Sequence, residues 1–74
     1  MVKVASVKKG SPADRAGVLK DDIIISVNGN EISDVLDYRF YLNDRKLTLV
    51  LDTARGKRVV TVHKDEEDDI GLQF

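Results

Sequence analysis

Few side chains in this sequence could do covalent chemistry. A hydrolytic triad needs a nucleophile beside a histidine and an acid, and the one histidine, His63, ends a strand-like stretch. Ser11 and Ser33 each precede a helix-like segment, where a hydroxyl can accept a hydrogen bond from the helix N-terminus. We therefore interpret His63 as a surface residue and both serines as helix caps. The sequence predicts no catalysis by this segment.

Metal and cofactor chemistry has equally little support. The acidic run at residues 65–69 lacks the alternating ligands and the glycine of a calcium loop, so we expect a mobile loop there. No glycine-rich loop that could cradle a phosphate is present. The absence of cysteine excludes disulfides, thiolate nucleophiles and cluster ligands together. The sequence predicts no cofactor in this segment.

Length and composition describe one small soluble domain. The chain has 74 residues, of which 42% are hydrophobic and 34% charged, and a domain near this size buries only about 60% of its unfolded surface. A net charge of −1 gives no basic field for nucleic acid. No apolar run reaches the roughly 20 residues that span a bilayer, and no signal-peptide pattern opens the chain. We expect a cytoplasmic protein with neither nucleic acid nor membrane as partner.

The elements that would position any site are organised around residues 11–29. Ser11 and Pro12 form a strong helix start, since serine can cap and proline suits the first helical position. Asp14 stands where a carboxylate can reach back as in a capping box. Gly17 offers the left-handed residue that ends the helix. The sequence predicts a short capped helix here.

A buried strand and a tight turn follow this helix. The β-branched run at residues 23–27 predicts a strand buried on both faces, and Asn28-Gly29 predicts a turn. A second helix should run from a cap at Ser33 or Asp34 to about Asn43. Further strands are expected at residues 2–7 with an irregularity, at 30–32, at 47–51, and at 57–63 after a hairpin turn at Gly56. About five strands and two helices make a small α+β, partly open barrel.

The order of short helix, buried strand and turn resembles that of a PDZ domain. The core of that family reads roughly S-P-A-x-x-A-G-L-x-x-G-D-x-I-L-x-V-N-G, and most of it stands in this sequence. The departures are Val18 for leucine and Asp21 for the glycine before the aspartate. The resemblance implies a PDZ-like fold and a non-catalytic module that binds a peptide or protein segment by strand addition.

The end of the chain resembles the carboxylate-binding loop of that family. Gly71-Leu72-Gln73-Phe74 is similar to G-L-G-F, with Gln73 in place of the second glycine. In familiar members this loop follows the first strand, whereas here the corresponding strand, residues 58–64, comes last. The resemblance therefore implies a circular permutation. The groove strand would begin near Leu72 and continue beyond Phe74, so we expect residues 1–74 to be one PDZ-like domain and an excised N-terminal segment of a longer protein.

The resemblance also implies which residues would touch a peptide. Backbone N–H groups of Gly71 and Leu72, with Gln73 as a third candidate, would hold a terminal carboxylate. Leu72 and Phe74 would line a pocket facing the second helix, or would simply belong to the core. The candidate peptide-binding residues are Ile70, Gly71, Leu72, Gln73, Phe74, Asp34, Asp37, Tyr38 and Lys64.

Residues outside the loop have alternative interpretations. Lys64 is the cation that could offset the acidic run. Asp34 or Asp37 stands nearest the position at the start of the second helix that helps to select the ligand, but Asp34 could instead stabilise the helix N-terminus. Tyr38 and Arg39 could face the groove or the solvent.

A closer resemblance concerns the parent protein. The permuted domain, residues 34–40 and the ending at residues 70–74 are together similar to one bacterial family, in which a PDZ domain precedes a radical SAM (iron–sulfur) oxidoreductase region of unknown function. The domain would then serve the attached enzyme in cis, and any cluster would lie outside this segment. The alternative is the substrate-recognition PDZ domain of a bacterial protease. The ligand of the module could also come in trans, as a protein C-terminus.

Overall fold

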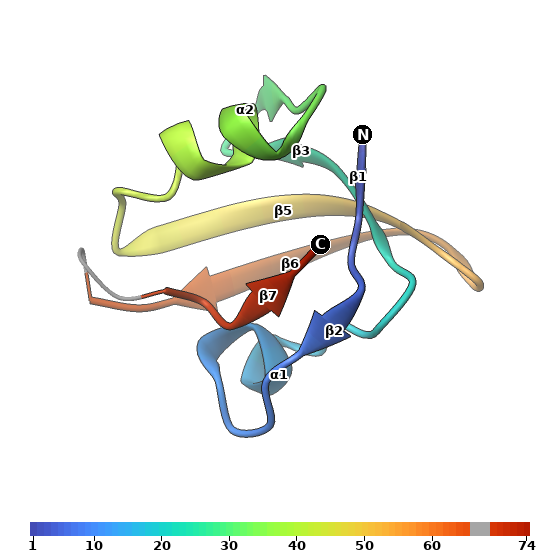
Figure 1. Ribbon diagram of the computed structural model, residues 1–74, viewed down its shortest axis with the longest axis horizontal. Coiled ribbons are helices and arrows are strands. Elements are labelled where there is room, and N and C mark those ends of the chain that lie inside the picture. The colour runs from blue at the N-terminus through green and yellow to red at the C-terminus, as the bar shows by residue number, and fades with distance from the viewer. Residues whose placement is uncertain (66–68) are drawn as a thin grey trace.

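The computed structural model describes residues 1–65 and 69–74, which form two helices and seven strands (Figure 1). In chain order the elements are β1 (Val2–Lys3), β2 (Ser6–Val7), α1 (Pro12–Ala16), β3 (Ile23–Val27), β4 (Asn30–Glu31), α2 (Val35–Phe40), β5 (Lys46–Thr53), β6 (Gly56–His63) and β7 (Leu72–Gln73). The expected mobile loop at residues 65–69 lies mostly outside the described residues.

Two antiparallel sheets share these strands. The larger has five strands in the order β1-β3-β5-β6, with β4 paired to β3, and the smaller joins β2 to β7. The long β5–β6 hairpin pairs from Lys46 with His63 to Thr53 with Gly56. The sheets do not close on themselves, so the expectation of a small, partly open α+β fold is confirmed. Strand β6 is the last strand of the main sheet in chain order, and the chain leads from it towards β7.

Helix α1 forms as its capping residues predict. The Asp14 N–H donates to Ser11 Oγ at 3.2 Å, and Pro12 occupies the first turn. The Asp14 carboxylate accepts from the Gly10 N–H at 2.8 Å, one residue before the cap position that the capping box uses. Gly17 ends the helix at φ 94°, where its N–H reaches the Asp14 carbonyl. Both ends of the helix are therefore hydrogen-bonded locally.

The expected first strand is split into two. Its halves pair with different partners, β1 with β3 and β2 with β7, so the irregularity in its sequence pattern is a break between sheets. Strand β3 has a bulge at Ile25 and buries Ile24 and Val27, while its other face is only half-buried. The prediction of full burial on both faces is wrong, because Ile23, Ile25 and Ser26 are only partly buried. The turn after β3 has positive φ at Asn28 and Gly29, as predicted.

Helix α2 is shorter than predicted. Asp34 caps it, and it ends at Phe40 instead of continuing to about Asn43. The next residues turn, and the Asp44 carboxylate accepts a hydrogen bond from the Asn28 side chain at 3.1 Å. Asparagine and aspartate compete with helical hydrogen bonding through their own side chains, so this segment favours a turn over a further helical turn. Neither helix in the described residues has the length or apolar content to cross a bilayer.

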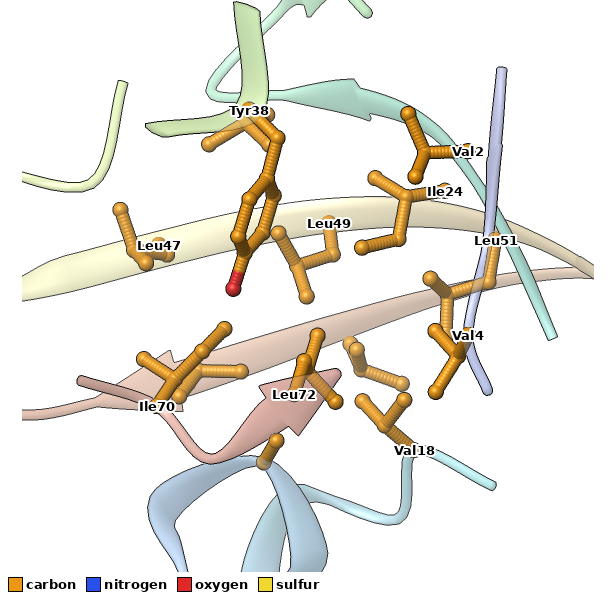
Figure 2. Close-up of a cluster of buried hydrophobic side chains, with 14 of the residues drawn as sticks. Val2, Val4, Val18, Ile24, Tyr38, Leu47, Leu49, Leu51, Ile70 and Leu72 are labelled. Carbon is orange, nitrogen blue, oxygen red and sulfur yellow. The ribbon is translucent and has the colours of Figure 1, made fainter. Parts of the chain in front are cut away.

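The core lies between the main sheet, α2 and β7 (Figure 2). Strand β6 turns Val60 and Val62 inward and leaves Val59 exposed, which confirms the predicted alternation. Both sheets contribute to one apolar cluster, and its fully buried large side chains are Ile24, Ile32, Leu47, Leu49, Leu51 and Ile70. The core thus fixes the last five residues of the chain against the rest of the fold.

Candidate functional site

Strand β7 is held by β2 along one edge only. Leu72 pairs with Val7 and Gln73 with Ser6, and the Gln73 carbonyl accepts from the Ala5 N–H at 2.7 Å. The Ser6 hydroxyl also donates to Gln73 Oε1 at 2.9 Å. Successive residues of a strand direct their backbone groups to opposite edges. Leu72 therefore directs its N–H and C=O away from β2.

Helix α2 forms the opposite wall through one aromatic side chain. The rings of Tyr38 and Phe74 meet edge to face with centroids 4.7 Å apart. Tyr38 is only 2% exposed, whereas Phe74 is 38% exposed and lies at the surface of this contact. Figure 2 shows the Tyr38 ring descending from α2 beside Leu49, with its hydroxyl pointing away from the helix. Of the two orientations left open for Tyr38, the inward one is adopted, while Arg39 is exposed.

The Tyr38 hydroxyl is buried without a hydrogen-bond partner among the described residues. Burial raises the pKa of this phenol well above its usual range, and the negative charge of Asp69 raises it further, while Arg39 acts in the opposite direction. Tyr38 is therefore a neutral hydroxyl near physiological pH.

The loop before β7 is fitted against the start of α1. The Ala13 N–H, one of the free donors at the helix N-terminus, donates to the Ile70 carbonyl at 3.0 Å. Gly71 has φ 91°, and a Cβ placed on it would lie 2.3 Å from Ser11 Cβ and 2.5 Å from Ser11 Oγ. Only glycine satisfies both the backbone conformation and this close approach. The capped helix thus positions the loop directly.

The loop contains a carboxylate of its own. Asp69 Oδ1 accepts a hydrogen bond from the Gly71 N–H at 3.1 Å, although Asp69 itself is exposed. Gly71 is the last residue before β7, so the N–H group nearest the start of the strand already has an anionic partner. Gln73 lies within β7 and not in the loop, so its replacement of a glycine does not restrict the loop's backbone.

A hollow of about 280 Å³ lies beside this loop, on the side of α1. It lies between the turn at residues 8–12 and the backbone of Asp69 and Gly71, and Lys8 and Lys9 are part of its lining. Sequence reasoning missed these two lysines because they are some 60 positions away from the loop. Only the pairing of β2 with β7 brings them there.

The remaining predicted site residues have structural partners. The Asp34 side chain accepts from the Asp37 N–H at 3.0 Å, and Asp37 accepts from the Ser33 N–H at 3.0 Å, so both acids cap α2. Of the two candidate caps it is Asp34, not Ser33, that caps the helix. Lys64 is buried and donates from Nζ to the Asp65 carbonyl at 2.9 Å. These three side chains are thus already engaged within the chain.

Catalytic and metal-binding groups do not gather in the described part of the chain. His63 is exposed on β6, and Ser11 is committed to capping α1. Residues 1–65 and 69–74 hold no group of three or more histidine, aspartate or glutamate side chains that could bind a metal ion. The candidate site therefore consists of three features: the free edge of β7, the aromatic contact of Tyr38 with Phe74, and the loop in which Gly71 binds the Asp69 carboxylate.

Comparison with known proteins identifies the family. Residues 3–53 match the PDZ domain family, and the chain belongs to it. The matched residues end with β5, before the β6–β7 part that forms the candidate site. PDZ domains are non-catalytic modules, so this segment is not an enzyme.

Several bacterial proteases contain a region similar to this chain. It is 38% identical over 73 residues to a probable periplasmic serine endoprotease DegP-like from Hahella chejuensis, covering 96% of the chain and 14% of that protein. It is 36% identical over 59 residues to the periplasmic pH-dependent serine endoprotease DegQ of Escherichia coli. This match covers 80% of the chain and 13% of that protein. The periplasmic serine endoprotease DegP of Salmonella typhimurium is 36% identical over 55 residues. The chain thus spans about one seventh of the length of such relatives.

These relatives correct two expectations. They are periplasmic by name, which contradicts the expected cytoplasmic location. Absent cysteine and an absent signal pattern were the basis for that expectation, and neither feature of a single domain reports where its parent resides. The relatives are also serine endoproteases, so they favour the protease alternative and give no support to the radical SAM family.

Proposed function

We propose that this domain binds an extended polypeptide segment by strand addition along the free edge of β7, with α2 as the opposite wall. The observation that supports this most is the orientation of Leu72, whose N–H and C=O point away from β2. An added strand needs such an unpaired edge to exchange main-chain hydrogen bonds. On the β7 wall the peptide would meet the backbone of Gly71 and Leu72 and the exposed side chains of Gln73 and Phe74. The buried side chains of Ile70 and Tyr38 would support the two walls from beneath.

The other candidate residues would have secondary roles. Asp34 and Asp37 cap the first turn of α2 and would thereby stabilise the helix that carries Tyr38. Lys64 follows the end of β6, and its hydrogen bond to the Asp65 carbonyl would stabilise the start of the loop that leads to β7. We assign these three residues to positioning the groove and not to contact with the ligand.

We further propose that the domain selects or positions substrate for an attached bacterial serine endoprotease that works in the periplasm. This rests on the relatives, whose names state both properties. The activity would belong to residues outside this chain, because the matched region is about one seventh of such proteins. The peptide would then come in trans, as part of a substrate.

The radical SAM parent has one feature in its favour, the similarity of residues 34–40 and 70–74 to that family. The sequence of the complete parent protein discriminates the two parents. Three closely spaced cysteines would support the iron–sulfur enzyme, and a serine protease region adjoining the domain would support the protease.

The binding mode is tested by selection followed by NMR. Two phage libraries share one randomised octamer, which ends in a free carboxylate in the first and continues into a Gly-Ser tail in the second. Selected octamers are synthesised and titrated into the ¹⁵N-labelled 74-residue chain. We expect the amides of Leu72 and Phe74 to shift, while the Ala5 amide on the β2 side stays nearly constant. Binding that shifts other parts of the sheet and leaves these two amides unchanged would refute strand addition at β7.

A further inference from the structure

The loop before β7 already holds the kind of group that a peptide C-terminus would bring. Asp69 Oδ1 lies 3.1 Å from the Gly71 nitrogen and accepts its hydrogen bond. The family resemblance implies that a terminal carboxylate would take this N–H together with that of Leu72, so it would compete with Asp69 for the first of them. Asp69 would have to leave this N–H before such a ligand could take it, and its charge would remain close by.

Among the described residues, Tyr38 and Phe74 pack in the region between α2 and β7 that a last side chain would enter. Tyr38 is 2% exposed, and its ring occupies the region between α2 and β7 beside Leu49. Phe74 closes this region from outside through the edge-to-face contact at 4.7 Å. A side chain at the end of a peptide would have to displace a packed tyrosine, whereas a strand running past along Leu72 would not.

Asp69 forms no ion pair with another described residue. Lys8 and Lys9 line the hollow on the α1 side, yet in the described residues neither forms an ion pair with Asp69. A second carboxylate brought to the loop would therefore meet the charge of Asp69.

We propose that this groove takes an internal extended segment of a polypeptide and discriminates against free C-termini, because Asp69 occupies the loop as a built-in carboxylate and Tyr38 packs in the region that a last side chain would enter. The inference rests on the proposed strand addition and names the ligand class for that same edge. It assigns Asp69 a specificity role that the family resemblance does not, since the resemblance implies capture of a terminal carboxylate.

The test uses one selected octamer in three forms: free acid, C-terminal amide, and extended by a Gly-Ser tail. Titration into the 74-residue chain should give equal affinity for the amide and the extended form. One like charge about 4 Å away in water corresponds to about a fivefold change in affinity, so the acid should bind about fivefold more weakly. Asp69→Ala frees the Gly71 N–H and removes the charge, and it should reverse this difference.

Two further variants separate charge from hydrogen bonding. Asp69→Asn keeps an acceptor for Gly71 but removes the charge, so it should abolish the fivefold difference, whereas Asp69→Ala, which also frees the Gly71 N–H, should go further and favour the free acid. Asp65→Ala removes an exposed acid from the same loop without touching Gly71, and it should leave the acid-to-amide ratio at the wild-type value. These side chains are exposed, so the variants should fold.

The outcomes distinguish this inference from the proposed function. If the free acid binds as tightly as the amide or more tightly in the wild-type chain, with shifts at Leu72, strand addition stands and the inference falls. An unchanged ratio in Asp69→Ala also overturns it. If no octamer from either library shifts Leu72 and Phe74, strand addition fails and the inference falls with it.

Discussion

Gly71→Ala should destabilise the domain more than the replacement of any of its other turn glycines by alanine. The positive φ of 91° costs an alanine about 1–2 kcal/mol. Its Cβ would lie 2.3 Å from Ser11 Cβ, and relieving such an overlap in a packed region costs about 1–3 kcal/mol. The expected loss is therefore about 2–5 kcal/mol, out of about 4–11 kcal/mol for a domain of this length.

Gly29→Ala is the matched control. Gly29 has φ 81°, but a Cβ there has no neighbour within 4 Å, so only the backbone cost of about 1–2 kcal/mol applies. Urea unfolding followed by far-ultraviolet circular dichroism measures both variants. The difference between them isolates the steric contact with Ser11.

A second substitution identifies the contact as the cause. Ser11→Gly removes both clashing atoms and costs the α1 cap only a few tenths of a kcal/mol, so in the Gly71→Ala background it should restore about 1–3 kcal/mol. Ser11→Ala keeps the Cβ at 2.3 Å and should restore much less. The reasoning is refuted if Gly71→Ala loses no more stability than Gly29→Ala, or if Ser11→Ala rescues as well as Ser11→Gly.

Other variants test neighbouring parts of the account. Tyr38→Phe removes an unpaired buried hydroxyl and should raise the free energy of unfolding by about 1 kcal/mol, whereas Tyr41→Phe should change it by less than about 0.5 kcal/mol. Because burial raises the pKa of Tyr38, the unfolded chain loses this proton first, so stability should fall above pH about 10, and less steeply in Tyr38→Phe. Phe74→Ala loses the ring contact with Tyr38 and should cost about 1 kcal/mol in urea unfolding, while Leu36→Ala, 76% exposed on α2, should cost less than about 0.5 kcal/mol. Gly17→Val should cost about 1–2 kcal/mol through its positive φ, and an unchanged melting temperature would contradict the left-handed helix end.

The sequence was sufficient wherever local chemistry decides the structure. Ser11, Pro12 and Gly17 define α1 through hydrogen bonds and dihedral angles that involve only near neighbours. The Asn28-Gly29 turn and the hairpin turn at Gly56 follow in the same way from positive φ. Alternation on β6 placed Val60 and Val62 inside because only one face of that strand meets the core.

Features that depend on distant pairing could not be predicted. The break between β1 and β2 exists because β7, more than 60 residues later, takes the second half of the strand. The contact of Asp44 with Asn28 and the ring contact of Tyr38 with Phe74 likewise join residues far apart in the sequence. The hydrogen bond from Gly71 to Asp69 is local, but sequence reasoning weighed the acidic run only as a repelling charge and so missed it.

The most direct test of the central claim is the position of a bound peptide relative to Leu72. A complex of the ¹⁵N,¹³C-labelled chain with an unlabelled selected octamer is examined for intermolecular nuclear Overhauser effects. Strand addition predicts contacts between the peptide backbone and the Leu72 amide, together with side-chain contacts to Phe74. Contacts confined to the exposed α2 side chains Leu36 and Phe40, with none at Leu72, would contradict it.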